Sequence, residues 1–390
     1  MRKLIRFGVD GYVAQLSSQR RKPDLGIVAN QSSLTSSLEY SPAALLPHAR
    51  LKYIFSPQHG FYGTEQANMI ESPDSVDQVT GARIVSLYSS TRKVNSAYLR
   101  KIDVLVFDLQ DVGSRYYTYL WTLYYCMQAC ERFGGKLIVL DRPNPINGIA
   151  TEGNVIQNNF TSFVGLYSIP NRFGLTIGEF AIMLKELKFK DVDLQVIGMN
   201  GWKRNTYFDS YKNYWIPASP NIPTVHTAVV YPGMCLFEGT NLSEGRGTTR
   251  PFEVVGAPFI DPKRLAERLA SFQLAGIKFR PTFYKPTFDK FKGRTCGGVF
   301  LHVVDRKKFK PLRTAMTLIS TIKELYPKQF RWFLGPYEYE RTTPAIDLLF
   351  GSDALRKTID LGSPLRPLFE ECEAEEKKFA QRARSWWLYT

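Results

Sequence analysis

Residues 104–116 read VLVFDLQDVGSRY, and residues 137–145 read LIVLDRPNP. In each stretch four apolar residues end on an aspartate, Asp108 or Asp141, and polar residues follow. A continuous apolar run bounded by turn residues is typical of a strand that is buried on both faces. Residues 117–132, between the two runs, are long enough for a crossover helix. The pattern therefore predicts a parallel strand–helix–strand unit, the building block of an α/β sheet.

Other parts of the first half of the chain fit the same sheet. Residues 24–29, 51–55 and 193–197 are predicted to be further strands. Thr176 and Glu179 form a capping box, which predicts that a helix begins at this point. Parallel sheets bind ligands at the carboxyl ends of their strands. The acids, amides and arginine that follow these strands therefore mark a candidate active site.

The sequence pattern changes near residue 256. Beyond it we expect two helices, two strands and a charged, mostly helical end, with the helices at 261–272 and 311–326 and the strands at 277–288 and 298–304. We therefore predict an α/β fold in two domains. Residues 1–255 are expected to form a Rossmann-like parallel-sheet domain with most of the site residues. Residues 256–390 are expected to form a smaller α+β domain that closes the cleft.

Composition limits the class of protein. With 390 residues, of which 44% are hydrophobic, the chain can bury a large core in two domains. The five cysteines and four histidines show no metal-ligand spacing, so we expect no metal site and unpaired cysteines in a reducing compartment. No apolar run reaches the ~20 residues of a membrane span. Arg6 and Asp10 interrupt the apolar start, so no export signal is expected and the predicted location is cytoplasmic.

The chain is strongly basic, with 51 Lys and Arg residues against 36 Asp and Glu residues and a net charge of +15. Basic clusters such as residues 20–22 and 306–308 are spread along the sequence and accompany no nucleic-acid-binding motif. This distribution favours a generally basic, solvated surface, and no nucleic-acid partner is expected. Binding of nucleic acid or another polyanion stays open as an alternative function.

The polar side chains of the candidate site indicate the chemistry of its ligand. Amides and acids bind hydroxyl groups, and arginine binds a carboxylate in bidentate fashion, so the set suits a carboxylated sugar. Glycoside hydrolysis needs a carboxylic acid that protonates the leaving oxygen. It also needs a second group for water, the anomeric carbon or a participating N-acetyl group. The chain has no dinucleotide-binding, Walker or nucleophile-elbow motif, so no cofactor is expected.

The candidate site residues fall into two groups. Those considered for the chemical step are Gln58, His59, Asp108, Asp111, Glu152 and Glu179, the last of which is a helix-capping residue in the alternative interpretation. Those considered for substrate binding are Asn30, Gln110, Arg115, Tyr116, Asp141, Arg142, Asn144, Glu238, Asn241, Glu244 and Arg246. Each acid alone is a weak signal, because an Asp at the end of a parallel strand often only caps the next turn. Together, at the ends of successive strands, they favour a site.

Ordered motifs along nearly the whole chain resemble those of the bacterial exo-β-N-acetylmuramidases, a family long known only as a domain of unknown function. The motifs include SPQHG at 56–60, residues 103–119, residues 140–145, SPNIP at 219–223, YPG at 231–233, residues 238–248 and CGGV at 296–299. The resemblance implies a Rossmann-like domain and a smaller α/β domain with the site between them. It also implies cleavage of terminal β-linked N-acetylmuramic acid from the non-reducing end of peptidoglycan fragments. Arg115 or Arg246 is then a candidate partner of the lactyl carboxylate of this sugar.

Two positions depart from the family pattern. The family usually has Glu where this chain has Gln58, and His where this chain has Phe173. An amide cannot act as a general acid, so Gln58 removes a proton-handling carboxylate, which Glu65 on the same loop is a candidate to replace. A catalytically impaired muropeptide-binding protein is therefore the first alternative to a glycosidase. In either case the expected partner is a muropeptide or amino-sugar ligand.

Overall fold

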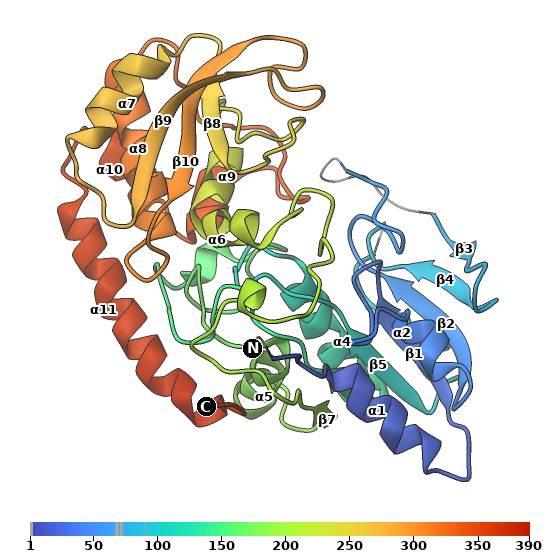
Figure 1. Ribbon diagram of the computed structural model, residues 1–390. Helices are drawn as coiled ribbons and strands as arrows, with labels where there is room; N and C mark the ends of the chain where they lie inside the picture. The colour runs from blue at the N-terminus through green and yellow to red at the C-terminus, as the bar shows by residue number, and fades with distance from the viewer. Residues whose placement is uncertain (1–2, 67–69, 71–72, 90) are drawn as a thin grey trace.

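The computed structural model describes residues 3–66, 70, 73–89 and 91–390, and Figure 1 shows the path of the chain through two sheets. Met1 and Arg2, at the start of the chain, lie outside the described residues. The larger sheet has seven strands in the order β3-β4-β2-β1-β5-β6-β7. These strands are β1 (Asp24–Ala29), β2 (Arg50–Ser56), β3 (Ser75–Val76), β4 (Arg83–Ser86), β5 (Val104–Asp108), β6 (Lys136–Leu140) and β7 (Asp193–Ile197).

The larger sheet is parallel except for β3, which runs antiparallel to β4. This confirms the predicted Rossmann-like sheet and the five strands expected from the sequence. From β1, the chain adds β2 and β4 on one side and β5, β6 and β7 on the other. The strand order therefore reverses between β1 and β5, and such a switch point is where ligands bind in open α/β sheets.

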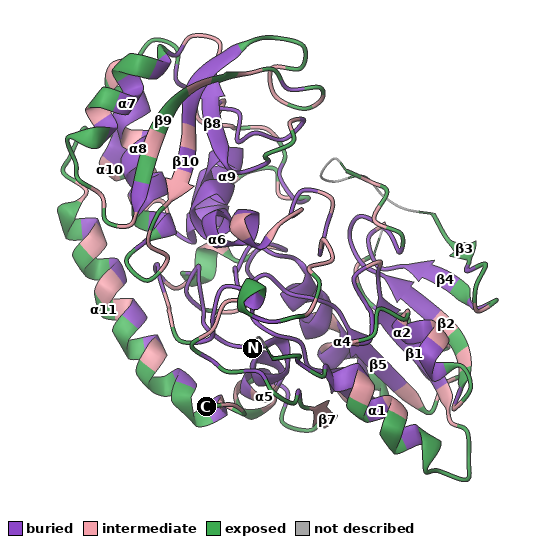
Figure 2. Cartoon of the chain, in the orientation of Figure 1, coloured by how far each residue is buried: buried purple, intermediate pink, exposed green. Residues whose placement is uncertain are grey.

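Helices cover both faces of the larger sheet, because alternate residues of a strand point to opposite sides. Val106 on β5 belongs to the core under α1 (Gly8–Ser17), whereas its neighbours Leu105 and Phe107 belong to the core under α4 (Tyr119–Phe133). Figure 2 shows β1 and β5 largely buried between these layers. The other covering helices are α2 (Ser41–Leu45), α3 (Ser96–Leu99) and α5 (Ile177–Leu187). The predicted crossover helix is α4, and the predicted capping box begins α5.

The second sheet has three antiparallel strands in the order β8-β10-β9, which confirms a smaller second domain. Helix α7 packs on it, and α8 packs between α7 and α6. The predicted strand 277–288 is too long, because β9 ends at Tyr284 and Pro286, which has no N–H for a ladder, follows. The elements are α6 (Val225–Met234), β8 (Val254–Ala257), α7 (Pro262–Ala270), β9 (Ile277–Tyr284), β10 (Cys296–Val303) and α8 (Pro311–Leu325).

The C-terminal part of the chain returns to the first domain. Helix α11 runs along one side of the molecule and ends near α5 (Figure 1). Beyond it, the Tyr389 hydroxyl donates to Asp141 over 2.6 Å, and the Leu388 N–H donates to Glu179 over 2.8 Å. The remaining helices are α9 (Ala345–Phe350), α10 (Ala354–Asp360) and α11 (Arg366–Ala383), with 3₁₀ turns η1 (Asn158–Phe160), η2 (Phe208–Ser210), η3 (Cys235–Gly239) and η4 (Arg384–Trp386).

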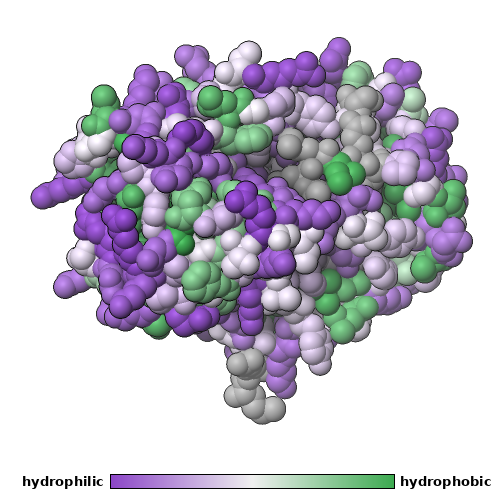
Figure 3. All heavy atoms as spheres, turned by 90° about the horizontal axis from the view of Figure 1, so that it is seen from above, coloured by the Kyte–Doolittle hydropathy of each residue, from purple (hydrophilic) through white to green (hydrophobic). Residues whose placement is uncertain are grey.

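The outer surface is mainly hydrophilic on the face seen in Figure 3, where hydrophobic residues form small separate groups. None of the helices in the described part of the chain has the length and apolar character of a membrane span.

Candidate active site

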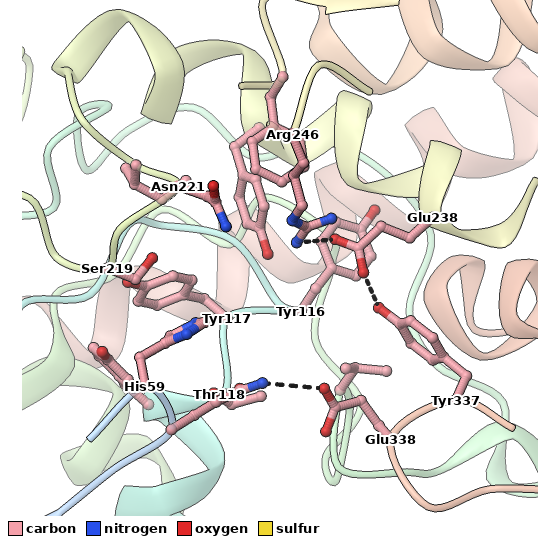
Figure 4. A pocket seen from close by; sticks show the side chains of 16 residues that line it. His59, Tyr116, Tyr117, Thr118, Ser219, Asn221, Glu238, Arg246, Tyr337 and Glu338 are labelled. Carbon is pink, nitrogen blue, oxygen red and sulfur yellow. Dashed lines mark hydrogen bonds and ion pairs between the residues drawn. The ribbon is translucent and has the colours of Figure 1, made fainter. Parts of the chain in front are cut away.

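A pocket lies between the loops of the two domains, with about 460 Å³ of empty space that opens to solvent (Figure 4). The loops after β2 and β5 supply one wall, and residues of α6, η3 and the loops that follow supply another. A C-terminal loop completes it. The lining side chains come from segments 58–59, 116–119, 219–222, 231–252 and 337–338, together with Val164. The pocket therefore combines segments that lie far apart in the sequence, as an active site between two domains does.

His59 stands on a sharp turn after β2, where both His59 (φ 73°) and Gly60 (φ 77°) have left-handed backbone conformations. Its Nδ1 lies 2.6 Å from the carbonyl oxygen of Glu65. Because a carbonyl only accepts, Nδ1 carries the hydrogen and Nε2 is an acceptor. Burial lowers the pKa of His59 to about 4, so the imidazole is neutral near pH 7.

Gln58 lies beside His59 in the pocket wall and is held by hydrogen bonds on both ends of its amide. The Thr118 hydroxyl donates to Gln58 Oε1 over 2.7 Å. Gln58 Nε2 donates to Glu338 Oε1 over 3.2 Å and to the Tyr88 hydroxyl over 3.3 Å. The amide therefore joins a loop of the first domain to a carboxyl group of the second.

Glu338 is a pocket residue that sequence reasoning missed. It is buried, and the Tyr88 hydroxyl donates to its Oε2 over 2.9 Å. Burial raises the pKa of Glu338 to about 7; Glu238 raises it further, and the hydrogen bonds from Tyr88 and Gln58 oppose the rise. Glu338 lies 280 positions after Gln58, in a loop that no predicted helix or strand includes. The only signal was the alternation of aromatic and acidic residues at 337–340.

Glu238 and Arg246 also line the pocket and form a charged network. Arg246 donates to Glu238 over 2.7 Å and to Glu244 over 3.0 Å, and the Tyr337 hydroxyl donates to Glu238 over 2.7 Å (Figure 4). Although burial opposes it, Lys290 and Arg246 hold the pKa of Glu244 below its ordinary value. The guanidinium of Arg246 is thus fixed at the pocket edge between two carboxylates.

Of the residues predicted for the site, Gln58, His59, Tyr116, Glu238 and Arg246 line this pocket. Tyr116 is anchored below it, since its hydroxyl donates to the Pro232 carbonyl over 3.0 Å. The remaining predicted residues do not line it, although Glu244 bonds to the lining residue Arg246. Sequence reasoning missed Thr118, Tyr337 and Glu338.

Asp108 and Arg142 were expected to face a ligand at the strand ends, but they face each other. Arg142 Nε donates to Asp108 Oδ1 over 2.6 Å, and Nη2 donates to Asp108 Oδ2 over 2.9 Å. Both side chains are buried, so the pair closes the base of the loops after β5 and β6. Asp141 accepts hydrogen bonds from Thr176, Gly178 and Tyr389, which tie α5 and the C-terminal tail to β6.

Arg115 also lies outside the pocket lining, although it was a candidate partner of a ligand carboxylate. Its guanidinium is buried and donates to four backbone carbonyls, those of Asn154, Ile169, Leu349 and Phe350. Burial lowers the pKa of Arg115 to about 10, which still leaves it charged near pH 7. Arg115 therefore joins the first domain to α9.

The other predicted acids have local partners. Glu179 completes the capping box of α5 and pairs with Arg204, as the structural interpretation of the sequence expected. Glu152 accepts from the Arg313 N–H over 3.0 Å, and Asp111 accepts from the Gly113 N–H over 2.6 Å. Burial raises the pKa of both Glu152 and Asp111 to about 7. The side chain of Glu65 is partly exposed. The predicted amides donate to backbone carbonyls, and these are Asn30, Gln110, Asn144 and Asn241.

Phe173, the second departure from the family pattern, lies in the hydrophobic core. Its ring is fully buried, and its centroid lies 6.1 Å from that of the Phe180 ring. Phe173 is absent from the pocket lining, so the hydrocarbon ring changes no group that faces the pocket. Within the described residues, no cluster of three or more His, Cys, Asp or Glu side chains is arranged to hold a metal ion.

Comparisons with known proteins identify the family. The family model "Exo-beta-N-acetylmuramidase NamZ, N-terminal" matches residues 25–226, and the corresponding C-terminal model matches residues 229–389. The peptidoglycan β-N-acetylmuramidase NamZ of Bacillus subtilis is 38% identical over 387 residues, which cover 99% of this chain and 91% of that protein.

Solved structures agree with this assignment. The crystal structure of a DUF1343 family protein from Bacteroides fragilis is 30% identical and covers 100% of both chains with a TM-score of 0.89. A second DUF1343 protein from the same organism is 27% identical and covers 99% of both chains with a TM-score of 0.75. The chain thus belongs to the exo-β-N-acetylmuramidase NamZ family.

Proposed function

We propose that this protein is a glycosidase that removes terminal β-linked N-acetylmuramic acid from the non-reducing end of peptidoglycan fragments. One observation carries this proposal: motifs that lie far apart in the sequence and carry the family resemblance meet in one pocket. They are the segments 56–60, 103–119, 219–223, 231–233 and 238–248, each of which contributes lining residues. The homologous Bacillus subtilis protein, a peptidoglycan β-N-acetylmuramidase, supports the same reaction for this chain.

The chemistry of the pocket suits an amino sugar. Two carboxyl groups, Glu238 and Glu338, face it, and glycoside hydrolysis uses a pair of such groups. Tyr117 and Tyr231 offer aromatic surface to the sugar ring, and Asn221 offers an amide to its polar substituents.

A pair of disaccharides tests the proposal. In one, N-acetylmuramic acid is at the non-reducing end and is β-linked to N-acetylglucosamine; in the other the order of the two sugars is reversed. An exo-acting muramidase releases both monosaccharides from the first and leaves the second intact. Mass spectrometry of the products measures this directly. Cleavage of both disaccharides, or of the reversed one alone, would contradict the proposed specificity.

A second candidate function is binding of a muropeptide without turnover, and Gln58 is the observation that favours it. Phe173 no longer supports this candidate, because it lies in the core and not in the pocket wall. Isothermal calorimetry with N-acetylmuramic acid, run beside the disaccharide assay, separates the two functions. Binding without any release of sugar would favour the binding protein, whereas release of N-acetylmuramic acid excludes it.

A further inference from the structure

Two loops from opposite ends of the chain place a carboxyl group where the family's glutamate is missing. Gln58 follows β2 in the first domain, and Glu338 lies in the loop before α9 in the second. Both line the pocket, and the Gln58 amide donates to the Glu338 carboxyl over 3.2 Å. Glu338 therefore lies next to position 58, where the family usually has a glutamate and this chain has a glutamine.

We propose that Glu338 is the catalytic acid of this protein and that Gln58 is a positioning residue that holds it. This assignment rests on the proposed glycosidase function and deepens it. Glu338 in its protonated form donates its proton to the glycosidic oxygen as the bond between that oxygen and C1 breaks. The bonding electron pair stays on the leaving oxygen, which becomes a hydroxyl group. Water then supplies the hydroxyl at C1, and its other proton returns through solvent to the Glu338 carboxylate.

The other acids near the pocket are less suited to donate a proton. Glu238 is held in an ion pair with Arg246 over 2.7 Å, whereas the hydrogen bonds that the structure gives to Glu338 come from the uncharged groups of Gln58 and Tyr88. Glu65 contributes its backbone carbonyl to His59, and its partly exposed side chain is not part of the lining. Glu152 and Glu179 lie outside the lining with partners of their own.

The Gln58 amide holds the Glu338 carboxyl group in a fixed position. Its NH₂ group donates to Glu338 Oε1 while its carbonyl accepts from Thr118, so the orientation of the amide is fixed. The Tyr88 hydroxyl donates to Oε2 of the same carboxyl. A carboxylate at position 58 has no hydrogen to donate and would share a proton with Glu338, because two like charges at this distance repel.

The surroundings of Glu338 keep part of it protonated near neutral pH. Burial raises the pKa of this carboxyl to about 7, and the nearby charge of Glu238 raises it too. The hydrogen bonds from Tyr88 and Gln58 and the charge of Arg92, which stacks 3.5 Å from the Tyr339 ring, act in the opposite direction. A general acid works best when its pKa lies near the working pH.

The variant Glu338→Gln tests the assignment, because its loss of activity should depend on the leaving group of the substrate. A disaccharide needs a proton on its departing oxygen, whereas 4-nitrophenolate departs without one. We expect Glu338→Gln to slow cleavage of the disaccharide by ~10²–10⁴-fold and to slow cleavage of 4-nitrophenyl β-N-acetylmuraminide far less. Similar losses on both substrates, or no loss on the disaccharide, would overturn the assignment while leaving the glycosidase function in place. Wild-type protein that cleaves neither substrate would overturn both.

A matched variant controls for the loss of a buried carboxyl group. Glu376 is also buried, its pKa is also raised by burial, and it accepts from the Gly153 N–H away from the pocket. We expect Glu376→Gln to keep the wild-type ratio between cleavage of the disaccharide and cleavage of the 4-nitrophenyl substrate. Glu338→Gln should lower this ratio. A matching change of the ratio in Glu376→Gln would count against a special role of Glu338.

Tyr88→Phe gives a second test that does not depend on the folding of Glu338→Gln. The change removes the Tyr88 hydroxyl and with it a hydrogen bond to the ionised form of Glu338. The pKa of this carboxyl therefore rises. Activity that needs the protonated acid is present below this pKa and falls as pH rises through it. The alkaline limb of kcat/KM should therefore move to higher pH in Tyr88→Phe. An unmoved limb in an active, folded variant would overturn the role of Glu338.

Discussion

At position 58, the difference between an amide and a carboxylate is the ability to donate a hydrogen bond. Gln58 uses this ability toward Glu338 and Tyr88, and its carbonyl accepts from Thr118. Considered alone, Gln58 indicates the loss of the family's catalytic acid. With Glu338 beside it, the change replaces an acid by a donor that holds another acid.

The first prediction follows from this contact. Gln58→Glu places a second carboxyl group against Glu338, and the two must share protons. The apparent pKa of the last proton of the pair is then higher than that of Glu338 alone, and activity that requires this proton persists to higher pH. We expect an upward shift of the alkaline limb of the pH–kcat/KM profile, without a large gain at the optimum. A gain of ~10²–10⁴-fold with an unchanged profile would instead show that Gln58 itself was the deficit.

The residues that sequence analysis could and could not find differ in how their partners are specified. Gln58, His59 and Tyr116 follow strands whose apolar runs are visible locally, so their place at one sheet edge was predictable. The partner of Asp108 was not, because an Asp and an Arg at adjacent strand ends can bind a ligand or each other. Here they form a buried ion pair with each other. Glu338 was missed because only tertiary folding brings its loop to Gln58.

At the scale of elements, the sequence predicts where a helix begins when nearby residues cap it. The capping box of Thr176 and Glu179 begins α5, and Asp261 caps α7 by accepting from the N–H groups of Lys263 and Arg264. The return of the C-terminal tail to the first domain had no such signal. It depends on contacts between residues about 200 positions apart, such as that of Trp386 with Glu186.

The second prediction concerns this tail. The Tyr389 hydroxyl donates to Asp141 over 2.6 Å and accepts from the Met199 N–H over 2.9 Å. Tyr389→Phe leaves a buried acceptor and a buried donor without this partner, which costs ~1–3 kcal/mol for each unsatisfied group. We expect a lower melting temperature, measured by differential scanning calorimetry, with the activity of the folded protein retained. Tyr214→Phe is the control, because this tyrosine is 70% exposed. Equal effects of the two changes would contradict the role of the tail.

At the scale of the whole molecule, part of the basic charge is neutralised by neighbouring acids. Arg268 pairs with Glu324 and Arg306 with Asp209 on the surface, and Arg356 pairs with the buried Asp347. The face shown in Figure 3 is likewise mainly hydrophilic. Local neutralisation of this kind favours a generally solvated surface.

The third prediction tests the polyanion alternative. If the net charge of +15 reflects a solvated surface, binding to duplex DNA should be weak. It should also collapse between low and physiological salt, because only counterion release drives it. Fluorescence anisotropy with a labelled duplex measures both properties. Tight, sequence-selective binding at physiological salt would instead support a nucleic-acid partner.

The fourth prediction concerns the pH dependence of stability. Burial raises the pKa of four carboxyl groups, Asp111, Asp141, Glu152 and Glu338, to about 7, from ordinary values of 3.8 for Asp and 4.5 for Glu. Between these values the folded chain holds protons that the unfolded chain has released, so a rise in pH favours unfolding. His59 opposes this trend, since burial lowers its pKa from 6.5 to about 4 and unfolding lets it take up a proton.

Four groups acting in one direction outweigh one imidazole acting in the other, because the individual shifts are of similar size. The stability from the four carboxyls is complete below pH 4 and is lost as pH rises through 7. We therefore expect the melting temperature to fall by several degrees from pH 5 to pH 8. Asp111→Asn removes one of the titrating groups and keeps an oxygen for the Gly113 N–H, so its melting temperature should fall less over the same range. A melting temperature that rises with pH would mean that these carboxyls are ionised in the folded protein, and Glu338 could then not serve as the acid near neutral pH.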